Sequence, residues 1–304
     1  MGMLDVGDGN LVHWEETGEG KPALVVHGGP GSPWPGAERY FDSARYRVIR
    51  IDQRGCGNSR PHAADPATDM RPNTTEHLIA DMERLREHLG IEKWLLFGGS
   101  WGSTLILAYA VRFPHRVSEI VLVGVTTSRW AEIEWLYQGV GRFLPAQWEQ
   151  FRDGVREEDR TDLRKILAGY AKLMDDPTTR MKAATDWARW EDAVIGHESN
   201  GKPDSYSDQP PDDLVAMVRI CAHYFANGMW LDDGIILREA HKLAGIPGVL
   251  IHGRLDLSSP LDTAWRLTKS WPDADLRVVD DAGHTGSEAM RAEMRAALER
   301  FEKS

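Results

Sequence analysis

Cysteine, long apolar runs and targeting signals are all scarce in this sequence of 304 residues. Its two cysteines, Cys56 and Cys221, are too few for a disulfide framework or a zinc site, and we interpret both as reduced, unpaired thiols. No segment approaches the roughly 18 consecutive apolar residues that a membrane-spanning helix requires. The N-terminal residues show no basic region followed by an apolar run, so no signal peptide is visible and we expect a cytoplasmic protein.

Positively charged residues are also scarce. The sequence has 36 Lys and Arg residues against 47 Asp and Glu residues, which gives a formal net charge of −11. Phosphate backbones and anionic lipids are bound by basic patches, so neither nucleic acid nor a membrane is expected as a partner. A positively charged substrate would suit this balance, although solubility alone also favours an acidic surface. No low-complexity tract or internal repeat is visible, and a chain of this length can bury a full hydrophobic core.

Short apolar segments alternate with longer segments of helical periodicity, as in a parallel sheet with crossover helices. Six segments are nearly continuous in apolar character and rich in β-branched residues, which is typical of strands buried on both faces. They comprise residues 23–26, 47–51, 94–97, 120–123, 249–251 and 276–279. We expect residues 11–16 to add an antiparallel strand at the edge of this sheet.

Three helices between and after these strands have recognisable ends. The first is expected to be capped by Asn73, to run to residue 89 and to stop at Gly90 with a left-handed backbone. The second spans residues 100–113 and ends before a proline. The last spans residues 287–301.

The alternation of strands and helices breaks between residues 127 and 243. This segment is helical in pattern, is rich in tryptophan and includes a polar, proline-bearing loop at residues 197–211. An insertion between two core strands is typical of a cap over the strand ends, where open α/β sheets bind ligands. The predicted architecture is an α/β core of residues 1–127 and 244–304 with a helical cap subdomain of residues 128–243.

The strongest chemical motif is Gly98–Gly99–Ser100–Trp101–Gly102, which fits G-x-S-x-G between a predicted buried strand and a predicted helix. In such a sharp turn, glycines two positions before and after the serine leave room for the neighbouring backbone. The turn lifts the serine hydroxyl out of the sheet, where Ser100 can act as a nucleophile. The alternative, a serine that only caps the helix, is disfavoured by the flanking strand.

A serine that attacks a carbonyl needs hydrogen-bond donors for the oxyanion that forms. One donor is expected from the backbone N–H of Trp101, the residue after the nucleophile. The loop after the first buried strand reads His-Gly-Gly-Pro-Gly at residues 27–31, and Gly29 is predicted to supply the second donor. The same loop is also a glycine-proline turn.

A hydroxyl becomes nucleophilic when a histidine takes its proton, and among eleven histidines only His284 follows the last predicted strand in a short turn. This position agrees with the chain order serine, acid, histidine of G-x-S-x-G hydrolases. The acid is expected in the turn after the preceding strand, where Asp256 is the first candidate and Asp262 the alternative. We interpret His252 and His223 as structural.

Residues 52–59 form a glycine-rich loop with the sequence Asp-Gln-Arg-Gly-Cys-Gly-Asn-Ser. The loop lacks the lysine of a phosphate-binding P-loop and does not open a helix, so nucleotide binding is disfavoured. We interpret it as structural, with the side chains of Asp52 and Arg54 pinning loops beside the active site.

Together these segments resemble the proline iminopeptidases, a family of serine peptidases with the α/β-hydrolase fold. The resemblance covers nearly the whole chain and rests on HGGPG at residues 27–31, DQRGCGNS at 52–59, GGSWGSTLILAYA at 98–110, HGRLD at 252–256 and AGH at 282–284. It implies a mostly parallel sheet flanked by helices. It also implies that an N-terminal residue, proline above all, is released from short peptides without metal or cofactor.

The resemblance further implies that acidic residues of the cap bind the free amine of the substrate. One acid matches Glu191 in a W-x-x-W-E pattern. The tryptophans of this pattern, Trp187 and Trp190, either add cation–π attraction to the ammonium or pack into the cap while Glu191 faces water. We favour amine binding by Glu191.

The second acid that the resemblance implies falls on Cys221, where a neutral thiol replaces the glutamate. One charge-assisted contact of roughly 1.5–3 kcal/mol would then be missing. Another cap acid, Asp232 or Asp233, is an alternative source of the contact.

Three functions are consistent with these residues. The first is an aminopeptidase in which Ser100 attacks the carbonyl of the first residue, His284 moves the proton and Glu191 holds the amine. The second, motivated by Cys221, is an esterase or amidase that acts on small acyl substrates without a free amine. The third is a binding protein that has kept the hydrolase scaffold, which the intact serine, histidine and acid set disfavours.

Overall fold

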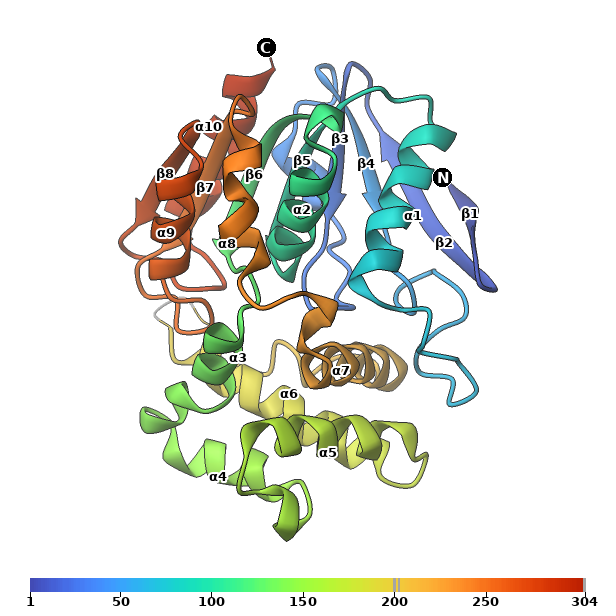
Figure 1. Ribbon diagram of the computed structural model, residues 1–304, viewed down its shortest axis with the longest axis vertical. Helices are drawn as coiled ribbons and strands as arrows, with labels where there is room; N and C mark the ends of the chain where they lie inside the picture. Colours follow the sequence, from blue (N-terminus) through green and yellow to red (C-terminus); the bar gives the residue numbers. More distant parts are fainter. Residues whose placement is uncertain (199–200, 202, 303–304) are drawn as a thin grey trace.

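Eight strands form one sheet in the described part of the chain, in the order β1-β2-β4-β3-β5-β6-β7-β8 (Figure 1). The computed structural model describes residues 1–198, 201 and 203–302, so part of the loop predicted at residues 197–211 lies outside the described residues. The pairings β1–β2 and β2–β4 are antiparallel, and those from β4 to β8 are parallel. The strands are β1 (Gly2–Gly7), β2 (Asn10–Thr17), β3 (Lys21–Val26), β4 (Tyr46–Ile51), β5 (Trp94–Ser100), β6 (Val117–Val125), β7 (Gly248–Gly253) and β8 (Ala274–Val279).

The six predicted strands are confirmed as β3 to β8, but burial on both faces is wrong for β8, an edge strand whose residues are mostly half-buried or exposed. The strand predicted at residues 11–16 is β2, and its antiparallel direction is also confirmed. Its position at the edge is wrong, because β1 lies outside it. The segment of β1 is short and bounded by glycines, and Val6 is its one buried residue, so it carries little apolar pattern.

Helices cover both faces of the parallel part of the sheet. Successive side chains of a strand point to opposite faces, so Leu24 and Leu96 belong to one hydrophobic core while their neighbours Val25 and Phe97 belong to the other. The first core includes residues of α1 (Thr75–His88), α2 (Trp101–Arg112), α8 (Ile235–Glu239) and α9 (Asp262–Ser270). The second core includes residues of α10 (Glu288–Phe301) and of the 3-10 helix η1 (Ala37–Tyr40).

The first predicted helix corresponds to α1, but Thr74 rather than Asn73 occupies its N-cap position. Asn73 is buried instead, where its Nδ2 donates to Arg54 O and its Oδ1 accepts from Tyr224 Oη. Its side chain therefore joins the loop of Arg54 to the helix that carries Tyr224, and does not cap α1. Gly90 has the left-handed φ of +64° that was expected after the helix.

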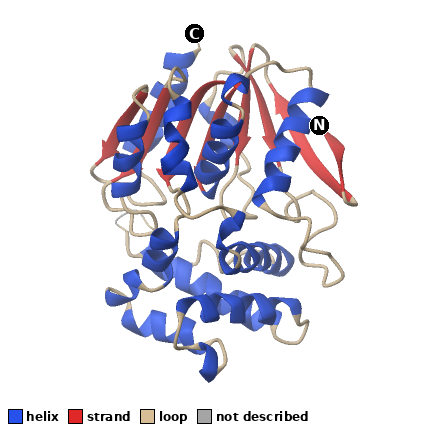
Figure 2. Ribbon diagram, viewed as in Figure 1, coloured by secondary structure: helices blue, strands red, loops and turns tan. Residues whose placement is uncertain are grey.

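Five helices gather beyond one end of the sheet (Figures 1 and 2): α3 (Trp130–Tyr137), α4 (Pro145–Asp153), α5 (Leu163–Asp175), α6 (Arg180–Gly196) and α7 (Pro211–Ala226). We call residues 130–226 the cap segment. After it, α8 and the 3-10 helix η6 (Ala240–Leu243) pack against α2, beside the sheet. The chain thus returns to the core before residue 243, where the sequence pattern places the boundary. The predicted boundary is late because α8 continues the helical pattern of the cap, so the sequence shows no break before it.

Four more 3-10 helices connect these elements: η2 (Pro114–Arg116), η3 (Gly139–Arg142), η4 (Glu157–Asp159) and η5 (Gly228–Trp230). Among the residues that the structure describes, no helix has both the length and the apolar character needed to cross a bilayer.

Candidate active site

Ser100 stands at the junction of β5 and α2 with a backbone that ordinary residues rarely adopt. Its φ of 54° and ψ of −130° store strain, and its side chain makes no cap bond to the helix. A Cβ atom at Gly98 or Gly102 would lie 2.5 or 2.3 Å from the carbonyl oxygen of Val26. The glycines of the motif are therefore required by the close approach of β3, as the sequence predicts. The alternative of a helix-capping serine is excluded.

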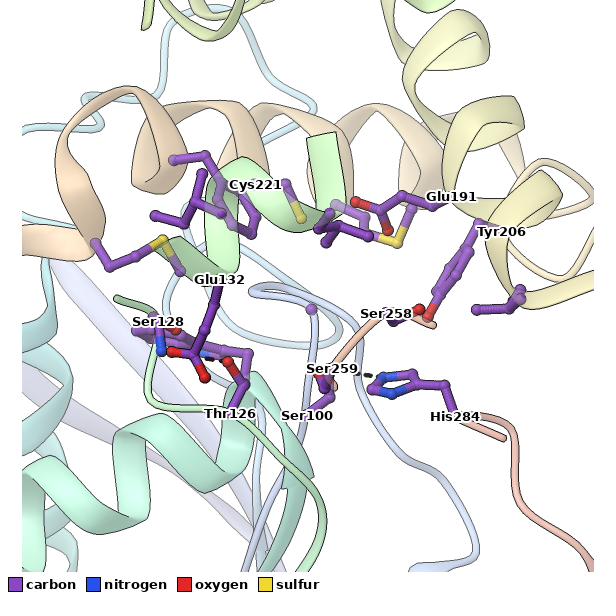
Figure 3. Close-up of a pocket in the computed structure, with 18 residues that line it drawn as sticks. Ser100, Thr126, Ser128, Glu132, Glu191, Tyr206, Cys221, Ser258, Ser259 and His284 are labelled. Atoms are coloured by element: carbon purple, nitrogen blue, oxygen red, sulfur yellow. Dashed lines mark hydrogen bonds between the residues drawn. The ribbon is translucent and has the colours of Figure 1, made fainter. Parts of the chain in front are cut away.

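His284 links Ser100 to Asp256. Its Nε2 lies 3.1 Å from Ser100 Oγ (Figure 3). Its Nδ1 lies 2.8 Å from Asp256 Oδ2. Asp256 is buried, and its Oδ1 accepts from Ser259 N at 2.8 Å. Asp262, the alternative acid, instead ion-pairs with Arg266. The structure thus brings together the serine, histidine and acid that the sequence places first.

The other two histidines considered from the sequence make backbone contacts. His252 is buried, and its Nδ1 accepts from Val125 N at 3.0 Å. The Nε2 of His223 lies 2.9 Å from Asn73 O.

Carboxylates around His284 favour its protonated form. Burial lowers the pKa of the imidazole, but the negative charges of Asp256, Glu198 and Glu191 outweigh burial and raise the pKa to about 9. Burial also opposes ionisation of Asp256, yet the charge of His284 and its hydrogen bond hold the pKa of that carboxyl below its usual value. At neutral pH the free protein therefore holds an imidazolium beside a carboxylate.

The two expected oxyanion donors border the same space as Ser100. Gly29 and Trp101 both line the cavity above the serine, and a Cβ atom at Gly28 would lie 3.3 Å from Ser100 Cβ. Gly29 has a φ of +106°, a conformation that glycine adopts without strain.

The side chain of Gln53 bridges the loop before Gly29 and the first residue of α2, Trp101. Gln53 Oε1 accepts from Trp101 Nε1 at 3.0 Å, and its Nε2 donates to His27 O at 2.9 Å. The glycine-rich loop at residues 52–59 therefore has a positioning role that the sequence interpretation, centred on Asp52 and Arg54, did not identify. Arg54 is structural as expected, because it is buried and ion-paired with Asp81.

A cavity separates Ser100 from the cap segment (Figure 3). Its floor includes Ser100 and His284, and Glu191 from α6 and Cys221 from α7 face it from above. Apolar side chains complete the wall: Ile133, Leu136, Ile195, Met217 and Phe225. Hydroxyl, carboxylate and imidazole side chains also line it, so the cavity combines apolar surface with polar groups beside the nucleophile, as a substrate pocket does.

Among the described residues of this wall, Glu191 has the one carboxylate with an oxygen that accepts no hydrogen bond from the protein. Its Oε1 accepts from Tyr137 Oη at 2.5 Å and from Trp187 Nε1 at 2.8 Å, and Oε2 has no hydrogen-bond partner among the described residues. Burial raises the pKa of Glu191 above its usual value, against these two hydrogen bonds. A cation that entered the cavity would meet a desolvated carboxylate with one oxygen available.

Trp187 and Trp190 do not line the cavity, so their predicted contact with the substrate is wrong. Both side chains are buried in the cap segment: the ring centroid of Trp187 lies 4.9 Å from that of Tyr137, and Trp190 stacks on Phe151 at 5.9 Å. Packing within the cap wins because tryptophan buries a large apolar area there. Trp187 still acts indirectly, through its hydrogen bond to Glu191.

Cys221 lines the cavity where the second acid was expected, and its Sγ donates to Pro30 O at 3.2 Å. Burial raises the pKa of this thiol well above its usual value, so it stays neutral. The proposed substitutes do not replace the missing charge: neither Asp232 nor Asp233 is part of the cavity wall, and Asp233 Oδ1 accepts from Trp130 N.

A second carboxylate in the wall, Glu132, is occupied by its surroundings. Its Oε2 accepts from Thr127 Oγ1 and from Arg129 N, each at 2.8 Å, and its Oε1 accepts from Thr263 Oγ1. This glutamate therefore stabilises the start of α3. Glu191 remains the candidate for a charged ligand contact.

Glu198, which follows α6, reaches from the cap segment to the loop of His284. Its Oε1 accepts from His284 N at 2.6 Å, and its Oε2 accepts from Thr285 N at 3.1 Å. A Cβ atom at Gly283 would lie 2.1 Å from Glu198 Cδ, so the glycine leaves space for this carboxylate. The sequence gives no periodic signal for this contact, because Glu198 lies in an irregular loop.

No group of three or more His, Cys, Asp or Glu residues comes together as a metal-ligand set within the described ranges.

Comparison with known proteins defines the class of the chain. A family model described as alpha/beta hydrolase fold matches residues 21–288. The acetylester hydrolase of Corynebacterium glutamicum has a similar structure, with a TM-score of 0.66 at 17% identity over 97% of this chain and 90% of that chain. At this identity the likeness concerns the fold alone. The chain is thus an α/β-hydrolase-fold protein, as the sequence predicts.

Two relatives make the assignment more specific. The chain is 48% identical to the probable proline iminopeptidase of Streptomyces coelicolor, over 96% of this chain and 93% of that protein. It is 41% identical to the proline iminopeptidase of Xanthomonas citri, over 95% of this chain and 91% of that protein. The chain therefore belongs to the proline iminopeptidase family, and the resemblance seen in its motifs is confirmed.

Proposed function

We propose that this protein is a serine aminopeptidase that releases an N-terminal residue, proline above all, from short peptides. Family membership supports the reaction. The observation that carries the proposal is the position of Glu191: its carboxylate, with one oxygen available, faces the cavity that ends at Ser100 and His284. An ammonium bound at Glu191 would hold the carbonyl of the same residue close to the serine hydroxyl.

The reaction begins at Ser100 Oγ, which attacks the carbonyl carbon after the first residue while its proton moves to His284 Nε2. The backbone N–H groups of Gly29 and Trp101 donate to the oxyanion. His284 then gives its proton to the leaving amine as the carbon–nitrogen bond breaks. A water molecule attacks the acyl-enzyme, passes a proton through His284 to Ser100 and releases the amino acid. We expect no metal or cofactor in these steps.

The apolar wall of the cavity fits the ring of an N-terminal proline. Leu136, Ile195, Met217 and Phe225 offer surface to the ring methylenes, each worth roughly 0.8 kcal/mol when buried. The secondary ammonium of proline has two N–H donors, of which Glu191 Oε2 can accept one. A peptide with a larger first residue would have to displace this wall.

The test compares proline p-nitroanilide with its N-acetyl derivative and with alanine and leucine anilides. We expect the free proline anilide to be hydrolysed fastest, with Ser100→Ala as the inactive control. A fluorophosphonate probe should label the protein but not the control variant. If the folded, probe-reactive protein releases nothing from any free-amine anilide, the proposal is wrong.

Cys221 favours a second candidate, an esterase or amidase that needs no free amine. A neutral thiol replaces one of the two acids that the family resemblance implies, so amine binding rests on Glu191 alone. Under this alternative the N-blocked substrates are hydrolysed faster than the free ones. Cys221→Glu, compared with the uncharged Cys221→Gln, should raise the preference for a free amine if the site recognises an ammonium.

A further inference from the structure

A second cavity opens on the other side of Ser100, away from the wall that carries Glu191. It is bordered by the residues around η1 and by α10, with contributions from Trp34, Tyr40, Met290 and Met294. Ser100, Gly29, Tyr206 and His284 line both cavities, so the two spaces meet at the catalytic centre. If the acyl part of a substrate occupies the first cavity, the leaving group extends into the second.

The charge of the second cavity is opposite to that of the first. Two arginines, Arg39 and Arg291, border it, and no Asp or Glu is part of its wall among the described residues. This is unusual for a chain with 47 acidic and 36 basic residues. Two carboxylates contact residues of this wall without lining it: Glu198 accepts from His284 N, and Glu288 forms an ion pair with Arg291.

The two arginines differ in what already neutralises them. Arg291 Nε lies 2.8 Å from Glu288 Oε2, in an ion pair on α10. Arg39 forms no ion pair with any residue that the structure describes, and its guanidinium instead contacts Tyr40. Arg39 is therefore the cation of this wall that is open to an external anion.

The side chain of Arg39 is held in place. Its Nη2 donates to Tyr40 Oη at 3.0 Å, and its Cζ lies 4.8 Å from the centroid of the Tyr40 ring. Gly36, with a φ of +78°, leaves room for it, because a Cβ atom there would lie 2.9 Å from Arg39 Nη1. Tyr40 itself is buried against Phe97 in the second core. A guanidinium fixed in this way loses less entropy when it binds an anion.

We propose that the second cavity is a leaving-group subsite in which Arg39 binds the C-terminal carboxylate of a short peptide. The inference rests on the proposed aminopeptidase function. A zwitterionic peptide would then place its ammonium at Glu191 and its carboxylate at Arg39, with the scissile bond at Ser100 between them. His284 borders both cavities, so it stands where the departing amine must receive its proton.

The experiment measures kcat/KM for Pro-Gly, Pro-Gly-Gly and Pro-Gly-Gly-Gly and for their C-terminal amides. For at least one length we expect the free acid to be hydrolysed up to about fivefold faster than the amide, as for a partly exposed ion pair. Arg39→Gln should bring this ratio to about one, because it lowers kcat/KM for the free acids more than for the amides. In about 1 M salt, where the screening length is about 3 Å, the preference of the unmodified protein should also vanish.

Two other arginines serve as controls. Arg291→Gln should lower the acid-to-amide ratio less than Arg39→Gln, because Arg291 already has an ion-pair partner in Glu288, which it shares with Arg295. Arg45→Gln removes an exposed positive charge outside the cavity wall and should leave the ratio unchanged. An equal effect of Arg45→Gln would show a general charge effect and would overturn the assignment to Arg39.

The outcomes separate this inference from the proposed function. If proline p-nitroanilide is hydrolysed but acids and amides react equally at every length, the leaving-group subsite is wrong and the aminopeptidase stands. If the amides react faster, the inference is likewise wrong. If no free-amine substrate reacts, both proposals fail together.

Discussion

The two cavities that meet at Ser100 differ in the origin and the charge of their walls. The first is closed by helices of the cap segment and presents Glu191, a half-buried residue whose carboxylate shares the wall with apolar side chains. The second is bordered mainly by core elements, η1 and α10, and presents Arg39 at its exposed rim. The difference indicates that the cap segment selects the residue to be released, whereas the core accepts the peptide that leaves.

The largest loss of activity is expected when the nucleophile that the two cavities share is removed. Ser100→Ala should lower kcat for every substrate on the order of a million-fold, because the nucleophile is lost while both binding cavities remain. Equilibrium binding of Pro-Gly-Gly to this variant should persist. Substantial activity of the folded variant would contradict the role of Ser100.

A smaller loss of activity is expected when only the first cavity is changed. Glu191→Gln should lower kcat/KM for free-amine substrates roughly ten- to hundredfold, because a charge-assisted contact to the ammonium becomes neutral. N-acetyl substrates carry no charge there and should not share this loss. Because Glu191 also raises the pKa of His284, both substrate types are measured at one pH below the pKa of the substrate amine, and the ratio of their kcat/KM values is compared between the two proteins. An equal loss for both substrate types would place Glu191 outside amine recognition.

A change in pH should affect hydrolysis alike whichever cavity binds the substrate, because His284 serves every substrate. His284 accepts the proton of Ser100 only when its imidazole is neutral, and its pKa in the free protein is about 9. We therefore expect kcat/KM to fall about tenfold per pH unit below that value. The substrate amine is titrated separately, so that its own pKa can be removed from the profile. A profile that is flat from pH 7 to 9 would contradict the assignment.

The smallest effect concerns the link between cap segment and core. Glu198→Gln keeps the shape of the side chain but removes a negative charge beside His284, so the bend in the pH profile should move to lower pH. Above the bend, kcat/KM should fall only a few-fold. Glu149→Gln, on the exposed surface of α4, should leave the bend in place. A merely structural role of Glu198 would lower stability without moving the bend.

The core was largely predictable because its signals are local. Strands buried on both faces are continuous in apolar residues, and the Ser100 turn is marked by glycines that the approach of β3 demands. The cap segment was less predictable, because its helical pattern does not say which face of α6 meets the cavity. Trp187 and Trp190 face the interior of the cap, and Glu191, next along the helix, faces the substrate space.

The contacts of Gln53 and Glu198 could not be predicted for a different reason. Each joins segments that are far apart in sequence, and neither belongs to a periodic pattern. Only the folded chain shows that Gln53 lies between the two segments that carry the oxyanion donors. Arg39 is similar, because an exposed arginine in a short 3-10 helix is ordinary until the fold places it in a cavity wall that includes Ser100.

The contact between Glu198 and the loop of His284 has a consequence for protein engineering. Exchanging the cap for that of another hydrolase is an obvious way to change specificity, and it treats the cap as a separable module. Here such a graft would leave two backbone N–H groups without an acceptor and a gap beside Gly283. A chimera would need a carboxylate from the new cap beside His284 N and Thr285 N, or a substitution at Gly283 that fills the space left by Glu198. Only then could its new specificity be measured.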